Sequence, residues 1–515
     1  MRPIKNAFSR VATIKAALLM TGSTYVVVFL GLLVNSITAR ALGPETYGHY
    51  AYVVWITGMI VMIANNGLNT TGIRFISECI GRKKRPAARA VHGWLLRAQW
   101  LCLMAVTIGF LLALPLTLPV GWREHVSVFG TVVVVGVAAK TLYLFWISVG
   151  KGYGQYAIEA FSSTAGSLAN ALCILILFAL GAPLVAYLVI FAVMSVTYAL
   201  IAWWMLRSRR ILSSKRPVDH ELSLRVTNHL GWTVILALAA AFGNKASETY
   251  LLSAYVGPAE LGFFTIAAGL ARGGVELLSS GVNAVLMPLM GHAYGSGGTE
   301  RVNAILADSI RFFMFAGLLL AGVGFMCADS IILLMYGAQY QPAVIVFRVM
   351  VVVAGLTLSQ GAFGALLSTT DNQRIRAVVA VVSVALSVVL AVLLVPRYGL
   401  NGAMAATALS SSVIFILLGG GIVRSFAVPL DWRLLGKLML AAAVAAVSAA
   451  GFLWVSPNVM LHLIGGVVYA VLFIVGTFLL RAWTESDMNH LMPLASRYPR
   501  TFGRLVPALS LRMRR

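Results

Sequence analysis

Long apolar runs alternate with short polar connections along most of the chain. A helix that crosses the hydrocarbon core of a bilayer needs about 20 mainly apolar residues, and fourteen runs of roughly this length follow one another. They are rich in Leu, Val and Ala and lack the regular alternation of membrane β-strands. The runs cover residues 17–38, 49–72, 91–117, 126–149, 157–180, 184–206, 230–256, 261–288, 305–327, 344–366, 376–395, 402–424, 434–455 and 459–480. We therefore predict an all-α polytopic membrane protein with about 14 transmembrane helices.

One polar turn occurs twice. Residues 42–48 read Leu-Gly-Pro-Glu-Thr-Tyr-Gly, and residues 256–262 read Val-Gly-Pro-Ala-Glu-Leu-Gly. Each copy lies between the first and second apolar runs of its half, and Gly followed by Pro breaks a helix. Such a repeat predicts two similarly folded lobes. Because each lobe holds an even number of spans, both would enter the membrane in the same orientation, as parallel repeats with a cavity between them.

The runs and the repeat together predict the domain boundaries. The chain divides into an N-terminal six-helix lobe at 1–206, a basic cytoplasmic linker at 207–229 and a C-terminal six-helix lobe at 230–424. Helices 13 and 14 follow at 425–480, and a basic cytoplasmic tail occupies 481–515. The expected fold is two parallel six-helix lobes plus two extra C-terminal helices.

The charge distribution predicts the orientation. The net charge is +23, although only 11% of residues are charged and 60% are hydrophobic. The bases gather in alternate connections, such as Arg82 to Arg85 and Arg207 to Arg216. This pattern follows the positive-inside rule and predicts that both termini are cytoplasmic. It also favours contact with anionic membrane lipids over binding of nucleic acid.

Signatures of soluble enzymes are missing from the sequence. There is no Gly-x-x-x-x-Gly-Lys-Ser/Thr loop and no His-Glu-x-x-His motif. The cysteines Cys79, Cys102, Cys173 and Cys327 have no paired spacing. We therefore predict a protein that is not an enzyme and that uses neither a cofactor nor a metal.

Ionisable residues inside the apolar runs are the candidates for chemistry. A charge at mid-depth costs about 2.5–3.5 kcal/mol on insertion scales, so it must face protein or water. Lys245 with Glu248, and Arg272 with Glu276, have spacings that allow ion pairs on one helical face. Such pairs could serve coupling or could simply tie helices together. Lys140 has no acid in its own run. With three bases against two acids, we predict a cationic cavity in which Lys140, Lys245 and Arg272 bind substrate.

The second apolar run ends in a cluster of amides. Asn65, Asn66 and Asn69 would be costly in contact with lipid, so we expect them to face a cavity or neighbouring helices. Substrate binding and interhelical hydrogen bonding remain equally open interpretations.

Several of these features resemble one known family. The Gly-Pro-x-x-x-Gly turn, the Asn-rich end of the second run and Tyr336 to Tyr340 resemble the polysaccharide-transporter branch of the multidrug/oligosaccharidyl-lipid/polysaccharide exporter superfamily. The resemblance implies a flippase of the bacterial inner membrane that moves undecaprenyl-pyrophosphate-linked oligosaccharide repeat units by alternating access. These units would serve O-antigen, capsule or exopolysaccharide synthesis, with polysaccharide polymerase and chain-length machinery as candidate partners.

Two other transport functions remain as alternatives. A flippase of the lipid-linked peptidoglycan precursor would share the fourteen spans and the cationic cavity. A cation-coupled drug antiporter is the weaker alternative, because its cavity should prefer acidic residues.

Overall fold

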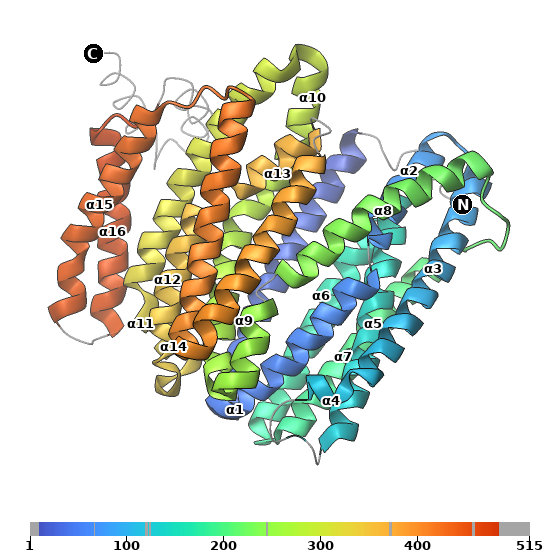
Figure 1. Cartoon of the computed structure of the whole chain (residues 1–515), viewed down its shortest axis with the longest axis horizontal. Helices are drawn as coiled ribbons and strands as arrows, with labels where there is room; N and C mark the ends of the chain where they lie inside the picture. The colour runs from blue at the N-terminus through green and yellow to red at the C-terminus, as the bar shows by residue number, and fades with distance from the viewer. Residues whose placement is uncertain are drawn as a thin grey trace. The chain divides into compact units, whose positions relative to one another are not determined.

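The computed structural model describes residues 10–65, 67–118, 122, 125–243, 246–369, 373–455 and 459–483. Every regular element in these ranges is a helix, as the sequence predicts (Figure 1). The longer helices are α1 (Arg10–Asn65), α2 (Leu68–Gly81), α3 (Arg85–Leu112), α5 (Val126–Gly152), α6 (Ala157–Ala179), α7 (Leu184–Ser208), α8 (His220–Gly243), α10 (Pro258–Met326), α12 (Ala343–Leu356), α13 (Gln360–Thr369), α14 (Gln373–Ser425), α15 (Trp432–Val455) and α16 (Val459–Leu479). The short ones are α4 (Leu114–Thr117), α9 (Ala246–Leu251), the π-helix η3 (Leu252–Val256), α11 (Ala328–Tyr336) and the 3₁₀-helix η4 (Ala338–Tyr340).

The chain forms two compact units. Unit 1 comprises Met1–Gly273 and Gln373–Ser410, and unit 2 comprises Gly274–Asn372 and Ser411–Arg515. Helices α10 and α14 are therefore each divided between the two units. The predicted lobe boundaries at 206 and 230 remain a prediction.

The number of membrane-crossing helices differs from the sequence count. Within the described residues, ten helices are long and apolar enough to span a membrane, or eleven if the bent pair α12 and α13 forms one span. Two of the ten are 47 and 48 residues long. At about 1.5 Å per residue each is roughly 70 Å long, more than twice the hydrocarbon core. Each has non-helical backbone at one glycine, Gly43 in α1 and Gly399 in α14. Each thus covers two predicted runs.

The seventh predicted run, 230–256, also differs from the observed helices. It is divided among α8, α9 and η3, with residues 244 and 245 outside the described ranges. None of these pieces is among the ten spanning helices. The count of fourteen is thus not confirmed, although the described helices follow the predicted runs closely.

The two copies of the repeated turn pack against each other in unit 1. A Cβ atom added to Gly48 would lie 1.7 Å from the carbonyl oxygen of Pro258. Reciprocally, a Cβ added to Gly262 would lie 2.9 Å from the carbonyl oxygen of Pro44. Only glycine permits backbones to approach this closely. Gly48 and Pro44 of the first copy correspond to Gly262 and Pro258 of the second copy. The two contacts are therefore equivalent, and the two turns pack pseudo-symmetrically.

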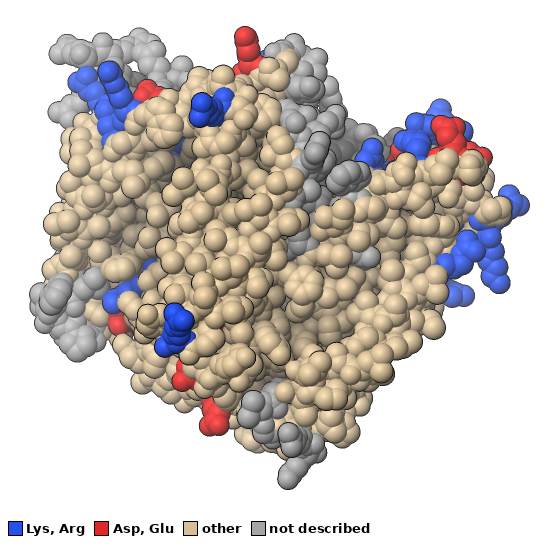
Figure 2. All heavy atoms as spheres, viewed as in Figure 1, with Lys and Arg blue, Asp and Glu red and all other residues tan. Residues whose placement is uncertain are grey.

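The basic connections of unit 1 gather at the ends of α2, α3, α7 and α8. Glu78 on α2 forms ion pairs with Arg82 and with Arg225 of α8, at 2.7 and 3.0 Å. The backbone N–H of Ser214, between α7 and α8, donates to the carbonyl of Arg89 on α3. On the face shown in Figure 2, charged side chains gather at this edge, over α2 and α8, and the broad surface beside it is uncharged. The positive-inside pattern predicts that this edge faces the cytoplasm.

Small residues also pack the helices of unit 2 closely. In α10, a Cβ on Gly317 would lie 2.0 Å from the carbonyl oxygen of Gly355 in α12. Gly322 lies against the ring of Tyr469 in α16, whose hydroxyl donates to the carbonyl of Leu318 at 3.0 Å. The hairpin of α15 and α16, outside the predicted repeat, is therefore packed directly on α10.

Candidate functional site

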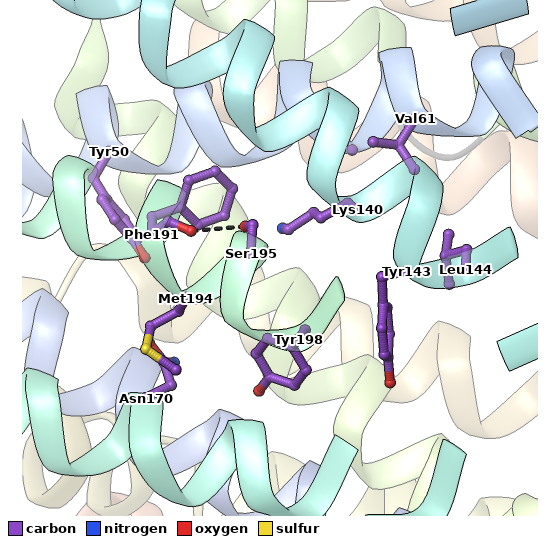
Figure 3. A pocket seen from close by; sticks show the side chains of 11 residues that line it. Tyr50, Val61, Lys140, Tyr143, Leu144, Asn170, Phe191, Met194, Ser195 and Tyr198 are labelled. Atoms are coloured by element: carbon purple, nitrogen blue, oxygen red, sulfur yellow. Dashed lines mark hydrogen bonds between the residues drawn. The ribbon is translucent and has the colours of Figure 1, made fainter. Parts of the chain in front are cut away.

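A pocket of about 410 Å³ lies among the helices of unit 1. Helix α1 contributes Tyr50 and Gly58, α6 contributes Asn170, and α7 contributes several of the other lining residues. Lys140 extends from α5 into this pocket toward Phe191 and Ser195 of α7 (Figure 3). The volume lies near the lower end of the range for small-ligand pockets, roughly 300–1,000 Å³, so the pocket suits a headgroup rather than a whole oligosaccharide. The remaining lining residues are Val61, Tyr143, Leu144, Met194 and Tyr198.

Lys140 is the charged residue of this pocket. Its ammonium nitrogen lies 4.0 Å from the centroid of the Phe191 ring, and no acidic side chain of the described residues forms an ion pair with it. A cation–π contact of a desolvated ammonium contributes about 2 kcal/mol. This offsets only part of the roughly 2.5–3.5 kcal/mol that a mid-membrane charge costs. The pocket therefore has a cation to offer an anionic ligand.

Polar groups on α6 and α7 surround the cation. The hydroxyls of Tyr198 and Ser167 are 2.9 Å apart, and the Tyr198 ring packs edge-on against Tyr143 at 5.5 Å. The Ser195 hydroxyl donates to the carbonyl of Phe191 at 2.7 Å, which leaves its oxygen lone pairs beside Lys140. The arrangement combines one positive charge with hydroxyl and amide groups, as recognition of a phosphate or a sugar requires.

Sequence reasoning identified Lys140 but not the residues around it. On α5, Lys140, Tyr143 and Leu144 have spacings of three and four, and on α7 Met194, Ser195 and Tyr198 repeat this spacing. Residues spaced in this way share one helical face, and each of these faces carries two polar side chains, Lys140 and Tyr143 on α5 and Ser195 and Tyr198 on α7. A search for such faces in the apolar runs would have indicated the pocket.

Glu248 occupies a second polar site in unit 1. The side chain is buried, at 1% exposure. One carboxylate oxygen accepts from Ser387 at 2.9 Å and from Thr407 at 3.5 Å, and the other accepts from Ser247 at 3.0 Å. Lys245, the expected ion-pair partner, lies outside the described residues. Hydroxyl donors from α9 and α14 thus contact both carboxylate oxygens, and the pairing of Glu248 with Lys245 stays a prediction.

The amide cluster forms hydrogen bonds within the protein. Asn65 donates to the carbonyl of Val61 at 2.9 Å, and Asn69 donates to the side-chain oxygen of Asn65 at 3.1 Å. Ser148 of α5 approaches Asn69 at 3.5 Å. These contacts fit the interhelical interpretation, while substrate contact by Asn65 and Asn69 remains a prediction. Asn66 lies outside the described residues.

Arg272 and Glu276 lie in the candidate span Pro258–Ser279, and both side chains are exposed. A charge facing hydrocarbon is costly, so we expect this face of α10 to meet water. Whether either residue contacts substrate remains a prediction. Within the described ranges no group of three or more His, Cys, Asp or Glu side chains could hold a metal ion.

The fold resembles several solved transporters. The structure of the lipid II flippase MurJ in an inward closed conformation superposes with a TM-score of 0.72 over 90% of this chain and 98% of that one, at 13% identity. An inward-facing multidrug resistance transporter of the MATE family and MOP superfamily gives 0.65 at 16% identity, covering 78% of this chain and 95% of that one. A MOP superfamily transporter from Pyrococcus furiosus, described as having a binding pocket of reversed polarity, gives 0.56 at 18% identity, over 80% and 96%. At these identities the similarity establishes the fold.

No curated protein matches the chain. The family model for polysaccharide biosynthesis proteins matches residues 14–294. The match covers the first eight apolar runs, both copies of the repeated turn and the Lys140 pocket. It spans more than half of the sequence, and the chain therefore belongs to the polysaccharide biosynthesis protein family.

Proposed function

We propose that this multi-pass membrane protein flips undecaprenyl-pyrophosphate-linked oligosaccharide repeat units across the bacterial inner membrane. The units would serve O-antigen, capsule or exopolysaccharide synthesis, and the two lobes would expose the substrate to either side by alternating access. Family membership and the transporter fold support a flippase. The observation that carries the proposal is Lys140, a cation without an acidic partner among the described residues, in a pocket of hydroxyl and aromatic groups.

The physical reason lies in the charge of the substrate. A pyrophosphate cannot be solvated by hydrocarbon, and attraction between charges strengthens as the dielectric constant falls. A lysine ammonium is a compact charge that suits phosphate oxygens. In this proposal Lys140 contacts the phosphate group, with Lys245 and Arg272 as further cations along the path.

Glu248 fits a different role. Its carboxylate is enclosed by three hydroxyl groups and does not line the Lys140 pocket. A buried carboxylate is tolerated in a protein when it is hydrogen-bonded. Binding of a proton or a cation would neutralise its charge. We assign Glu248 to coupling of transport to an ion gradient, separate from substrate contact.

The test replaces Lys140 with a neutral side chain of similar length. Loss of a hydrogen bond to a charged group costs about 1.5–3 kcal/mol, and each 1.4 kcal/mol is a factor of ten. Lys140→Met should therefore lower flipping of a pyrophosphate-linked substrate in proteoliposomes at least about tenfold, and Lys140→Arg should retain most of it. Lys83→Met, in the exposed loop between α2 and α3, is the matched control. Flipping by Lys140→Met at the rate of the Lys83→Met control would refute the proposal.

A second candidate is a flippase of the lipid-linked peptidoglycan precursor. The observation that favours it is the superposition on the lipid II flippase over 90% of this chain. The two functions separate in the same proteoliposomes, because a precursor with a peptide stem and a peptide-free oligosaccharide repeat unit can be offered in competition. Preference for the peptide-bearing precursor would favour the second candidate.

A further inference from the structure

The uncharged polar groups that line the Lys140 pocket divide into two sets. The hydroxyls of Ser195, Tyr198 and Tyr143 already form hydrogen bonds with other groups of α6 or α7. The Asn170 amide and the Tyr50 hydroxyl form no hydrogen bond with any residue that the structure describes, although both line the pocket. A polar group at the wall of a pocket needs a partner, which is either water or a ligand. The second set is therefore available to a ligand.

The available groups lie away from the cation. Lys140 and Tyr50 both pack on the ring of Phe191, the ammonium at 4.0 Å from the ring centroid and the Tyr50 ring edge-on at 6.4 Å. Figure 3 shows Phe191 between the two, with Tyr50, Met194 and Asn170 on the side of the pocket away from Lys140. A ligand whose anionic group meets Lys140 can thus extend past Phe191 to a second group of contacts.

Met194 lies across from Asn170. Helices α6 and α7 form an antiparallel hairpin with a connection at 180–183, and the hydrogen bond between Ser167 and Tyr198 fixes how they align. Asn170 comes about one turn after Ser167 on α6, and Met194 comes about one turn before Tyr198 on α7. The Met194 side chain is buried and lines the pocket. An amide and a thioether therefore form one end of the pocket together.

This pair of side chains suits one chemical class of ligand. The Asn170 side chain offers a carbonyl acceptor and two N–H donors in one plane. An acetamido group presents an N–H donor and a carbonyl acceptor, so the two amides can form a pair of hydrogen bonds. The acetamido methyl group needs an apolar surface, which the flexible thioether of Met194 supplies. A hydroxyl group could also bond Asn170, but it would leave a polar group against Met194 without a partner.

We propose that Asn170 and Met194 recognise an acetamido group on the sugar that is joined directly to the pyrophosphate, while Tyr50 contacts a hydroxyl of the same sugar. This inference rests on the proposed function for the pyrophosphate at Lys140. Because a pocket of about 410 Å³ suits a headgroup rather than a whole oligosaccharide, only the sugar next to the pyrophosphate reaches Asn170. Selection among substrates then depends on this one sugar, and the rest of the repeat unit lies outside the pocket.

The experiment measures the dissociation constants of two probes with the full-length protein in nanodiscs. Both probes carry the same short prenyl chain and pyrophosphate, and they end in either N-acetylglucosamine or glucose. They therefore differ only in an acetamido group against a hydroxyl group. Since a site built around a hydrogen-bonding group rejects an analogue that lacks it, the wild-type protein should bind the acetamido probe at least about tenfold more tightly. Equal binding of the two probes, or tighter binding of the glucose probe, would overturn the inference.

Variants identify the side chain that produces the preference. Asn170→Leu removes the amide at similar size, and the two probes should then bind equally well. A merely structural role for Asn170 would change both dissociation constants together and leave their ratio as it is. Thr197→Val is the matched control on α7, because the Thr197 hydroxyl bonds the carbonyl of Val193 and does not line the pocket. Its ratio should equal that of the wild-type protein. An Asn170→Leu protein that keeps the wild-type ratio would also overturn the inference.

Lys140→Met separates this inference from the proposed function. It removes a contact to the pyrophosphate, which both probes share, so both should bind at least about tenfold more weakly with an unchanged ratio. If Lys140→Met binds both probes as tightly as the wild-type protein and keeps the preference, the proposed phosphate contact fails and the sugar site stands. If Lys140→Met weakens both probes but the wild-type protein shows no preference, the sugar site fails and the phosphate contact stands.

Discussion

Replacing Gly48 with alanine should force apart the two copies of the repeated turn. The added Cβ would lie 1.7 Å from the carbonyl oxygen of Pro258, whereas ordinary contacts begin at 3.4 Å. The backbones must therefore separate by about 1.7 Å at this point. Since the obstructing atom belongs to the main chain, no side-chain rotation can relieve the overlap. The two turns, or the helices behind them, have to move.

The expected effect on stability follows from two opposed terms. Overpacking typically costs about 1–3 kcal/mol, and a backbone overlap of this size belongs at the upper end. Glycine inside a helix is otherwise about 0.5–1 kcal/mol less stable than alanine. Gly48→Ala should thus destabilise the protein by about 1–2 kcal/mol. The apparent thermal midpoint of the purified protein in detergent measures this effect.

Two further glycines give a graded comparison. A Cβ on Gly262 would lie 2.9 Å from the carbonyl oxygen of Pro44, so Gly262→Ala requires a shift of only about 0.5 Å. A Cβ on Gly31 meets no atom within 4 Å, so Gly31→Ala should be neutral or stabilising. The thermal midpoint should therefore be highest for Gly31→Ala, lower for Gly262→Ala and lowest for Gly48→Ala. A Gly48→Ala protein as stable as Gly31→Ala would refute the packing of the turns described here.

Two polar clusters give further predictions. A hydrogen bond from Arg225 holds the pKa of the Glu78 carboxyl below its ordinary value of 4.5. This stabilisation is present above the unfolded-state pKa and is lost as pH falls through the lowered folded-state pKa. Glu78→Gln should therefore flatten the dependence of the thermal midpoint on pH below about 4.5, and an unchanged profile would contradict it. Ser387→Ala should cost about 1.5–3 kcal/mol, as for hydrogen bonds to charged groups. Thr407→Ala should cost less, because the Thr407 hydroxyl lies 3.5 Å from the Glu248 carboxylate and the Ser387 hydroxyl lies 2.9 Å from it. Equal thermal midpoints of the two variants would contradict this hydrogen-bond geometry.

Hydrophobic periodicity predicts the helices of this protein well, because the bilayer requires long apolar runs and internally satisfied backbones. Hydrophobic periodicity predicts the breaks within these helices less well. Gly43 lies in the turn identified by its Gly-Pro pair, and the structure has non-helical backbone there. The division of residues 230–256 into α8, α9 and η3 was not predicted, since the run carries no Gly-Pro signal before Gly257.

The candidate site was only partly predictable for a different reason. A charge in an apolar run stands out in the sequence, and Lys140 was identified in that way. Which uncharged residues surround it depends on the packing of four helices, and Asn170 or Tyr50 has no distinguishing signal of its own. For Glu248, spacing indicated Lys245 as a partner, which stays a prediction, and it did not indicate the hydroxyl groups of Ser387 and Thr407 on α14. Spacing describes a single helix, whereas the contacts from Ser387 and Thr407 join segments that are far apart in sequence.

Segment 50–63 of α1 lies between the Lys140 pocket and a second, apolar cavity of unit 1 of about 510 Å³. Ile60 and Val61 are neighbours in sequence yet face different cavities, the apolar one and the Lys140 pocket. Because the helix is a close-packed rod, it cannot adjust one face independently of the other. A shift of segment 50–63 toward α5 and α7 would narrow the Lys140 pocket and widen the apolar cavity, and the reverse shift would do the opposite. Gly48, which fixes the contact between the repeated turns, lies two residues before this segment on the same helix. A movement of the turns would therefore change the Lys140 pocket and the apolar cavity together, and in opposite senses.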